Sequence, residues 1–288
     1  MPKIKVVLCP TDFTDVSRGE LTLAVDVCET FGARLVLHHN LSAAPPGLTR
    51  AWEWNELHRD DGQISGPEAE RRLRTLMAEL PKTIALEASV SRGPVATVLL
   101  EMAKQLPADL MVLGSHGCSS EDHASLTERM IDACPCAVLT IHEGAQLQHF
   151  RLSTAPGGSP TRVLVPTDLS PVAARVVDYA VELARVAPLH LHMLHVLPPG
   201  SSQAAIDRAR RKMEALAAAS PAVRLTHHVE LGEPVETIVR FSTEMGAGFV
   251  VMGEHSRGLL LRLFIRDTAR AVLQRACCPV WFVPASAC

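Results

Sequence analysis

The sequence has no apolar run long enough to cross a membrane and no strong excess of one charge. Of the 288 residues 47% are hydrophobic, yet no run reaches the roughly 18 residues that a membrane-spanning helix needs. The formal net charge is −3 with both signs interspersed, which leaves neither a basic surface for nucleic acid nor an acidic tail. Segment 1–12 becomes polar too soon for a signal peptide. We therefore expect a cytoplasmic protein with neither a membrane nor a nucleic acid as partner.

Two kinds of reactive site are also missing from the sequence. The eight cysteines never have the C-x-x-C spacing of a redox motif, and most lie in apolar runs, where a thiol acts as a small hydrophobe. No nucleophilic triad is apparent, and Ser115 has no visible base partner. The sequence thus favours structural thiols in a reducing compartment, and a protein that is not an enzyme.

What the sequence does contain is an internal repeat. The segment VVLCPTDFTD returns as VLVPTDLSP, with Asp12 and Asp168 separated by 156 residues. The segment that ends in VLGSHG returns as one that ends in VMGEHS, with Gly114 and Gly253 separated by 139 residues, and CPCAVLTIH returns as CCPVWFVP. The first copy is therefore 17 residues longer (156 minus 139) between its second and third strands.

The repeat defines the domain organisation. We predict one domain at residues 1–143, a linker at 144–160 that ends in APGGSP, and a second domain at residues 161–288. Each copy alternates short apolar strands with helices, which predicts an α/β fold with a doubly wound parallel sheet. Gly32 is typical of a helix end and Ser170-Pro171 of a helix start. Ligands of such sheets bind beyond the carboxyl ends of the strands, where the PTD, GSHG and GEHS turns lie.

These motifs, in this order, resemble the universal stress protein family. The matching features are PTDFTDVS, the histidine after the second strand (His39 and His195), the G-x-P before the third helix, GSHG and CPCAV. The resemblance covers both copies and implies two Rossmann-like domains of the adenine nucleotide alpha hydrolase type. It also implies an intramolecular pseudo-dimer in which the fifth strands, AVLTI and VWFVP, meet and protect each other's edges. A further homodimer and an unknown protein partner stay open.

The resemblance implies a nucleotide site in the first copy. ATP-binding members carry G-x-x-G, nine residues and then G-[S/T], because glycines admit the phosphates and the next helix offers free N–H groups. Here Ala124 and Ser125 follow Gly117 after only six residues. ATP or another adenine nucleotide would be held by Pro10, Thr11, Asp12, Leu113, Gly114, His116, Gly117, Ala124, Ser125, Leu126 and Thr127.

Two features weaken that expectation for the first copy. Glu121 and Asp122 lie in the shortened loop and would repel phosphates unless Mg²⁺ intervenes. Asp12 has a structural alternative as well, since an aspartate that ends a strand often only stabilises the turn. In the same region Ser125 and Glu128 have the spacing of a capping box for the last helix.

The second copy keeps the spacing of the glycine motif but not its chemistry. Gly253 remains, while Arg266 and Asp267 replace the last glycine and the serine. Asp267 is predicted to cap the last helix itself, in the place of a phosphate. Arg262, Arg266 and Arg270 would line one helical face, either as an anion grip or as a solvated, ion-paired surface. A nucleotide is therefore expected in the first copy if in either.

Thirteen histidines invite a metal hypothesis. His116, Cys118, Asp122 and His123 lie close together, but their spacing matches no standard closed zinc site, so zinc is disfavoured. The histidines at 190, 192, 227 and 228 are expected on strand surfaces rather than as ligands. Three functions stay open: a stress-response sensor or adaptor that acts by binding, a slow ATP hydrolase, and a metal- or redox-responsive switch.

Overall fold

The computed structural model describes residues 4–41, 64–115, 126–142, 144–153, 158–253 and 262–284. The first copy folds as five strands and four described helices, and the strands predicted from the repeat are confirmed. In chain order the elements are β1 (Val6–Pro10), α1 (Asp15–Phe31), β2 (Arg34–Leu41), α3 (Gly66–Glu79), β3 (Leu86–Arg92), α4 (Val95–Gln105), β4 (Leu110–Ser115), α5 (Leu126–Ala133) and β5 (Ala137–His142).

The second copy repeats this order. Its elements are β6 (Thr161–Pro166), α6 (Pro171–Ala184), β7 (Leu189–Leu197), α7 (Gln203–Ala218), β8 (Leu225–Leu231), α8 (Pro234–Glu244), β9 (Phe249–Gly253), α9 (Arg262–Arg275) and β10 (Val280–Val283). Helices α3 and α7, between the second and third strands, were not identified from the repeat. Among the described residues, no helix is both long enough and apolar enough to span a bilayer.

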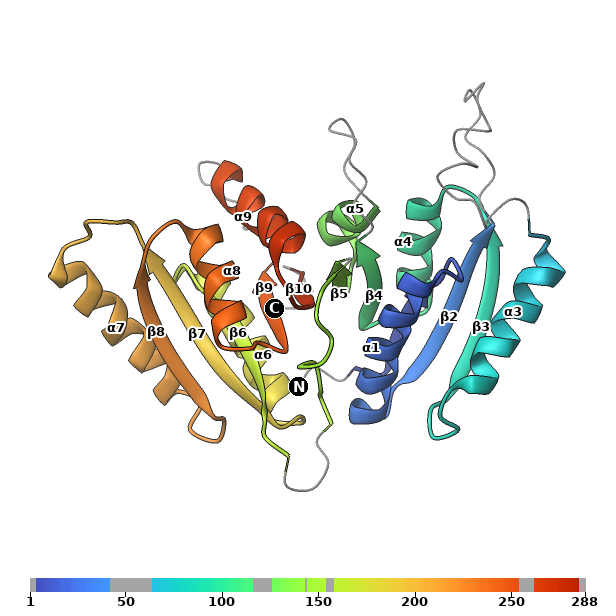
Figure 1. The fold of residues 1–288 in the computed structure, drawn as a ribbon, viewed down its shortest axis with the longest axis horizontal. Helices are drawn as coiled ribbons and strands as arrows, with labels where there is room; N and C mark the ends of the chain where they lie inside the picture. Colours follow the sequence, from blue (N-terminus) through green and yellow to red (C-terminus); the bar gives the residue numbers. More distant parts are fainter. Residues whose placement is uncertain are drawn as a thin grey trace.

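All ten strands form one sheet in the order β3-β2-β1-β4-β5-β10-β9-β6-β7-β8 (Figure 1). Neighbouring strands within each copy are parallel, whereas β5 and β10 are antiparallel. At this central pairing Trp281 lies opposite Leu139, with Val280 opposite Thr140 and Phe282 opposite Val138. The predicted meeting of the two fifth strands is therefore confirmed.

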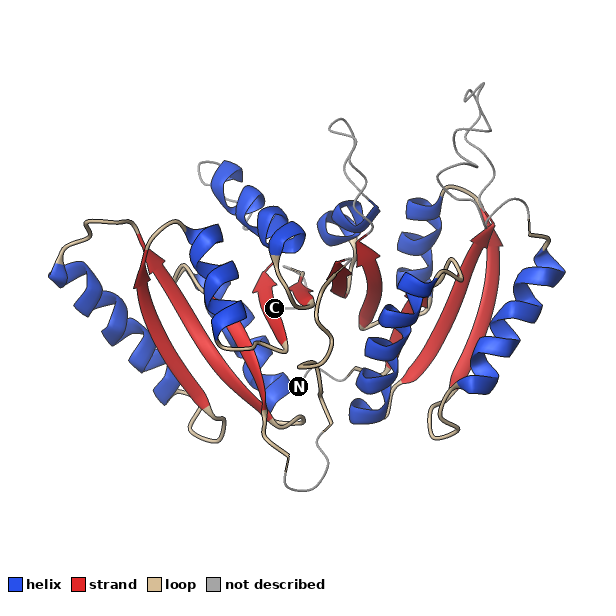
Figure 2. Ribbon diagram, in the orientation of Figure 1, coloured by secondary structure: helices blue, strands red, loops and turns tan. Residues whose placement is uncertain are grey.

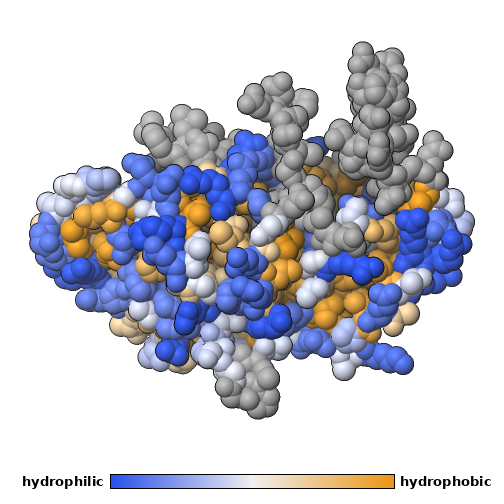
Figure 3. All heavy atoms as spheres, viewed as in Figure 1, coloured by the Kyte–Doolittle hydropathy of each residue, from blue (hydrophilic) through white to orange (hydrophobic). Residues whose placement is uncertain are grey.

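Helices cover both faces of the sheet (Figure 2). Alternate strand residues point to opposite faces, so Val7 and Cys9 belong to the core that also contains residues of α1, α3, α6 and α7, while Val6 and Leu8 belong to the core with residues of α4, α5, α8 and α9. Each of the two cores contains residues of both copies. On the face seen in Figure 3, apolar residues reach the surface in several separate areas with polar residues between them. The two copies thus share continuous cores rather than touching at a surface.

Equivalent residues of the two copies meet at the centre of the sheet. Leu139 and Trp281 are 142 residues apart, as are Glu128 and Arg270, and this is also the separation of the repeated Cys136 and Cys278. Arg270 on α9 makes a bidentate ion pair with Glu128 on α5. The two side chains differ in size in the pair of Leu139 and Trp281 and in charge in the pair of Glu128 and Arg270. The two copies are therefore complementary at this contact. Two halves of the same kind would bring two large rings or two like charges together.

The segment that joins the copies is ordered where it is described and packs into the protein. Phe150 and Leu152 are buried, and the Phe150 ring lies 5.4 Å from the Phe249 ring of the second copy. The Asp26 carboxylate on α1 accepts hydrogen bonds from the Leu152 N–H at 2.6 Å and the Ser153 hydroxyl at 2.9 Å. The first half of segment 144–160, which the sequence predicted as a linker, therefore packs into the core.

Several predicted helix ends can be compared with the structure. Gly32 ends α1 with a φ of 65°, and the Ser170 side chain accepts the Ala173 N–H at the start of α6, so both predictions are confirmed. The prediction that Asp267 caps the last helix is wrong, because α9 begins at Arg262 and residue 267 lies inside it. The capping box of Ser125 and Glu128 lies partly outside the described residues.

The ion pair between the copies should contribute to stability. We expect Arg270→Glu to lower the free energy of unfolding by about 1–2 kcal/mol, since Glu128 is only 12% exposed although Arg270 is 44% exposed. Combining it with Glu128→Arg should restore most of the loss. Urea unfolding of the two single variants and the double variant tests the pair. Arg275→Glu, which removes the exposed pair between Arg275 of α9 and Glu236 of α8, is the control and should cost less.

A close backbone approach gives a second stability prediction. A Cβ on Gly248 would lie 2.5 Å from the His149 carbonyl oxygen and 2.4 Å from a methyl group of Thr161. Gly248→Ala should therefore destabilise the protein by roughly 1–3 kcal/mol, because the joining segment would have to move. A Cβ on Gly66 would meet only a methyl group of Leu41 at 3.8 Å, so Gly66→Ala should hardly change the stability. Thermal unfolding of the two variants and the wild type measures the difference. Equal effects would contradict the packing described for the joining segment.

Candidate functional site

The strand order identifies one ligand-binding position in each copy. In the first copy β1 lies between β2 and β4. The connection after β1 leads to β2 on one side, and the connection after β4 leads to β5 on the other side. Ligands of doubly wound sheets bind at such a switch point. Asp12 follows β1 and Gly114 lies near the end of β4, and Asp168 and Gly253 occupy the same places in the second copy. The structure thus brings each PTD turn to the same edge of the sheet as the first glycine of the predicted glycine motif.

The PTD turn has the same geometry in both copies. The Thr11 hydroxyl accepts the Phe13 N–H at 3.1 Å, and Asp12 Oδ1 accepts the Thr14 N–H at 2.9 Å. Phe13 has a φ of 65°, which is unusual for a residue other than glycine. These bonds show that one oxygen of Asp12 has a structural task in the turn.

The second copy reproduces each of these contacts. Thr167 accepts the Leu169 N–H at 3.1 Å, Asp168 Oδ1 accepts the Ser170 N–H at 2.9 Å, and Leu169 has a φ of 60°. Backbone strain of this kind persists only where the surroundings hold it in place. Because the copy without the glycine chemistry keeps the turn, the turn itself does not require a nucleotide.

The repeated histidine after the second strand holds this turn. His39 Nδ1 lies 2.8 Å from the Thr11 carbonyl oxygen, and His195 Nδ1 lies 2.8 Å from the Thr167 carbonyl oxygen. A carbonyl oxygen only accepts, so Nδ1 carries the proton in both rings. In the first copy the Phe13 ring also packs 4.5 Å from the ring of His39. Both histidines therefore position the turn rather than presenting a free imidazole.

The glycine turn of the first copy is tied to the start of α5. The Thr127 hydroxyl donates to the Gly114 carbonyl oxygen at 2.9 Å, and its side chain is 2% exposed. The equivalent residue of the second copy, 142 positions later, is Ala269, which cannot make this bond. Leu113 is buried in the core and Leu126 is 37% exposed. Of these predicted site residues, Leu113 and Thr127 could offer a ligand little beyond their backbone.

Part of the predicted site lies outside the described residues. This applies to His116, Gly117, Ala124 and Ser125, and also to the loop residues Cys118, Glu121, Asp122 and His123. The metal hypothesis for that loop is therefore neither supported nor contradicted. Within the described ranges, no group of three or more His, Cys, Asp or Glu side chains could hold a metal ion.

A buried carboxyl group beside the site was missed from the sequence. Glu20 on α1 is 4% exposed, and its Oε1 has no hydrogen-bond partner. Burial, followed by the charge of Asp12, raises the pKa of Glu20 to about 8, and a hydrogen bond with the Gly114 backbone offsets part of the rise. A signal was available, because Glu20 lies one turn before Ala24 on the apolar stripe of the helix. The equivalent residue of the second copy is Val176.

The second copy contains a histidine cluster that the sequence did not reveal. The rings of His190 and His192 lie 4.1 Å apart, and His192 Nδ1 lies 3.1 Å from His228 Nε2. Burial, and then the neighbouring histidines, lower the pKa of His192 to about 4. His190 and His192 lie side by side along β7, and His192 also contacts His228 on β8.

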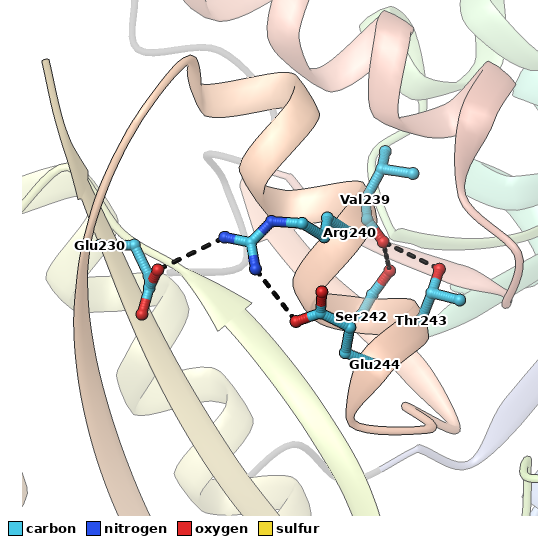
Figure 4. Close-up of polar contacts among 6 residues, drawn as sticks. All are labelled: Glu230, Val239, Arg240, Ser242, Thr243 and Glu244. Carbon is cyan, nitrogen blue, oxygen red and sulfur yellow. Dashed lines mark hydrogen bonds and ion pairs between the residues drawn. The ribbon is translucent and has the colours of Figure 1, made fainter. Parts of the chain in front are cut away.

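An ion-pair network lies beside this cluster. Figure 4 shows Arg240 of α8 reaching Glu230 on β8 at 3.3 Å and Glu244 at 3.0 Å. In the same helix the Ser242 and Thr243 hydroxyls donate to the Val239 carbonyl oxygen (Figure 4). The arginine holds α8 against β8, so we assign the network a structural role.

The buried cysteines have the properties of structural thiols, whereas Cys277 is exposed. Cys134 and Cys136 are buried with their sulfur atoms 3.3 Å apart, and Cys9 and Cys28 are also buried. The hydrogen bond with Cys134, together with burial, raises the pKa of the Cys136 thiol far above its usual range. Such thiols form little thiolate, which is the reactive form. The arrangement favours packing over redox chemistry, as the sequence suggested.

The Glu20 carboxyl predicts a pH dependence of stability. Its pKa is about 8 in the folded protein against 4.5 for the ordinary carboxyl group, so the stability it contributes is complete below pH 4.5 and is lost as the pH rises through about 8. Glu20→Gln should remove this dependence and stabilise the protein at pH 8.5 by roughly 2–4 kcal/mol relative to wild type. Denaturant unfolding at several pH values measures it. Parallel curves for the two proteins would show that Glu20 is ionised when folded.

Comparison with known proteins places the chain in a family. The model of the universal stress protein family matches residues 3–142 and 160–284. No curated protein matches the chain. A solved universal stress protein from Archaeoglobus fulgidus is 20% identical and has a TM-score of 0.70, with 98% of this chain and 97% of that chain covered. A functionally unknown protein from Pseudomonas aeruginosa is 15% identical with a TM-score of 0.65, and 99% and 94% are covered.

A smaller structure matches one copy. This structure is a universal stress protein from Archaeoglobus fulgidus in complex with dAMP. The two sequences are 25% identical, the TM-score is 0.36, and the match covers 44% of this chain and 98% of that chain. The two larger matches show that the whole fold, both copies included, occurs in other proteins. Because the family model matches both copies over most of their length, this chain belongs to the universal stress protein family, as a tandem member with two Rossmann-like domains.

Proposed function

We propose that the protein acts by binding an adenine nucleotide at the switch point of its first copy, as a sensor or adaptor in a stress response. The observation that carries the proposal is the position of Asp12 and Gly114 at the carboxyl ends of the adjacent strands β1 and β4. Family membership supports the ligand class. The Thr127 bond to Gly114 favours the first copy, since it fixes the glycine turn beside the start of α5.

The second copy is less suited to a phosphate group. At the positions of the last glycine and the serine of the motif the second copy has Arg266 and Asp267, and both lie inside α9. Inside a helix the backbone N–H groups bond to the carbonyl oxygens four residues earlier, so those of residues 266 and 267 are not free for a phosphate. A helix start can bind an anion only where its first N–H groups face the ligand. We infer that the second copy serves mainly as the structural partner of the first.

Binding is favoured over hydrolysis by how the described groups are used. The Thr127 hydroxyl donates to Gly114, and Asp12 Oδ1 accepts the Thr14 N–H and, at 2.6 Å, the Thr14 hydroxyl. A general base must reach the proton that it removes. These contacts support positioning of the turn, and none of them supports activation of water. Mg²⁺ would accompany ATP and reduce repulsion from the acidic residues of the loop sequence.

The proposal predicts a difference between the two copies. Asp12→Asn should weaken binding of ATP with Mg²⁺ by about tenfold or more, because a charge-assisted contact at the site is lost. The matched change Asp168→Asn should leave the affinity unchanged while perturbing an identical turn. Isothermal titration calorimetry on the full chain measures both. Equal effects of the two substitutions would contradict the assignment to the first copy, and absence of binding by wild type would contradict the proposed function.

The tie between Thr127 and Gly114 can be tested in the same assay. Thr127→Ala copies the residue that the second copy has at this position, Ala269. It should weaken ATP binding several-fold, because the carbonyl of the glycine turn loses its donor and the turn is less well held. Circular dichroism of the variant serves as the control for folding. An unchanged affinity would show that the bond serves packing alone.

A further inference from the structure

The buried Glu20 carboxyl lies directly against the glycine turn of the first copy. A Cβ on Gly114 would come within 1.9 Å of Glu20 Oε1, so a side chain at position 114 would displace this carboxyl. The side chain is 4% exposed, and its Oε1 has no hydrogen-bond partner. Removing a carboxyl from water without a full set of partners costs free energy. In the second copy a Cβ on Gly253 would lie 2.8 Å from a methyl group of Val176. An apolar side chain there fills the position that the Glu20 carboxyl fills in the first copy.

The groups around Glu20 determine its charge. Asp12, in the turn after β1, acts on it with a like charge, and from β4 only the Gly114 backbone contributes, through a hydrogen bond. From β1 it faces Cys9, whose buried thiol has its pKa raised further by Glu20. Burial is the main cause and the like charge of Asp12 the second, and together they raise the pKa of Glu20 to about 8. Near neutral pH the Glu20 carboxyl is protonated, so the negative charge beside the site comes from Asp12.

We propose that Glu20 controls how much negative charge the site of the first copy accepts: protonated, it permits an anionic phosphate group at the Gly114 turn, and ionised, it repels that group. The inference rests on the proposed nucleotide binding and couples it to the protonation of Glu20. Coupling between two ligands is reciprocal, so a bound phosphate must also favour protonation of Glu20. Nucleotide binding at mildly alkaline pH is then accompanied by proton uptake. The second copy, with Val176, has no such coupling.

The experiment measures affinity for ATP with Mg²⁺ on the full chain between about pH 6.5 and pH 9.5. For wild type we expect the affinity to fall by at least about tenfold as Glu20 ionises, the size expected for two like charges within several ångströms near a protein surface. Glu20→Gln should not show this part of the decline, because its amide stays neutral. Titration of the ligand's own phosphate is common to both proteins and cancels in the comparison.

Two further measurements separate Glu20 from a general charge effect. Glu29→Gln removes an exposed carboxyl from the same helix and should keep the wild-type pH profile. Calorimetry at pH 8 in buffers of different ionisation enthalpy should show proton uptake on binding for wild type and less for Glu20→Gln. The carbon-13 NMR signal of the Glu20 carboxyl in the ligand-free protein reports its ionisation independently of any nucleotide.

The outcomes distinguish this inference from the proposed function. If wild type and Glu20→Gln bind ATP with the same pH profile, the role of Glu20 is overturned while nucleotide binding stands. If neither protein binds ATP at any pH, including those at which Glu20 is neutral, both proposals fail. If the NMR signal shows Glu20 already ionised at pH 6.5, the inference fails whatever the binding data show.

Discussion

The antiparallel pairing of β5 with β10 is the contact on which the rest of the structure depends. It joins two five-stranded sheets into one and satisfies two strand edges that would otherwise present unpaired N–H and C=O groups. Trp281 is fully buried at this seam, and the Thr140 hydroxyl donates to the Val280 carbonyl oxygen at 3.1 Å. Both apolar cores pass through the same place. Each copy therefore relies on the other for part of its interior, and differences between them can accumulate without loss of the fold.

Those differences are concentrated on one side of the switch point. The PTD turn, with its strained residue and its histidine contact, is the same in both copies, so it forms the common scaffold. The glycine turn differs: Thr127 and Glu20 support Gly114, whereas Ala269 and Val176 surround the equivalent place in the second copy. Polar side chains therefore lie near Gly114 in the first copy, and apolar side chains occupy the equivalent positions in the second. Duplication thus separated a candidate ligand site from a stabilising partner.

The sequence predicted the strands, the repeat and the meeting of the fifth strands, because these depend on local apolar patterns and on motif order. It did not predict contacts that depend on packing between elements. The Glu20 carboxyl looked like one polar residue in a stripe, and only the approach of β4 shows that it lies beneath Gly114. The cluster around His192 depends on the register of β7 against β8, which alternation alone does not fix. The start of α9 was misplaced because Asp267 is a good cap by type, yet the helix extends past it.

The central pairing has a consequence for how the protein is made. Thr140 and Val280 are separated by 140 residues, so β5 must wait for its partner while the second copy is synthesised. At about 5–20 residues per second this delay lasts on the order of 7–30 s. During that time a nascent first copy carries an open strand edge, and neighbouring nascent chains on one messenger RNA would offer each other identical edges. The Glu128 carboxylate beside that edge would then face another Glu128, and this repulsion keeps the edge available for its own chain.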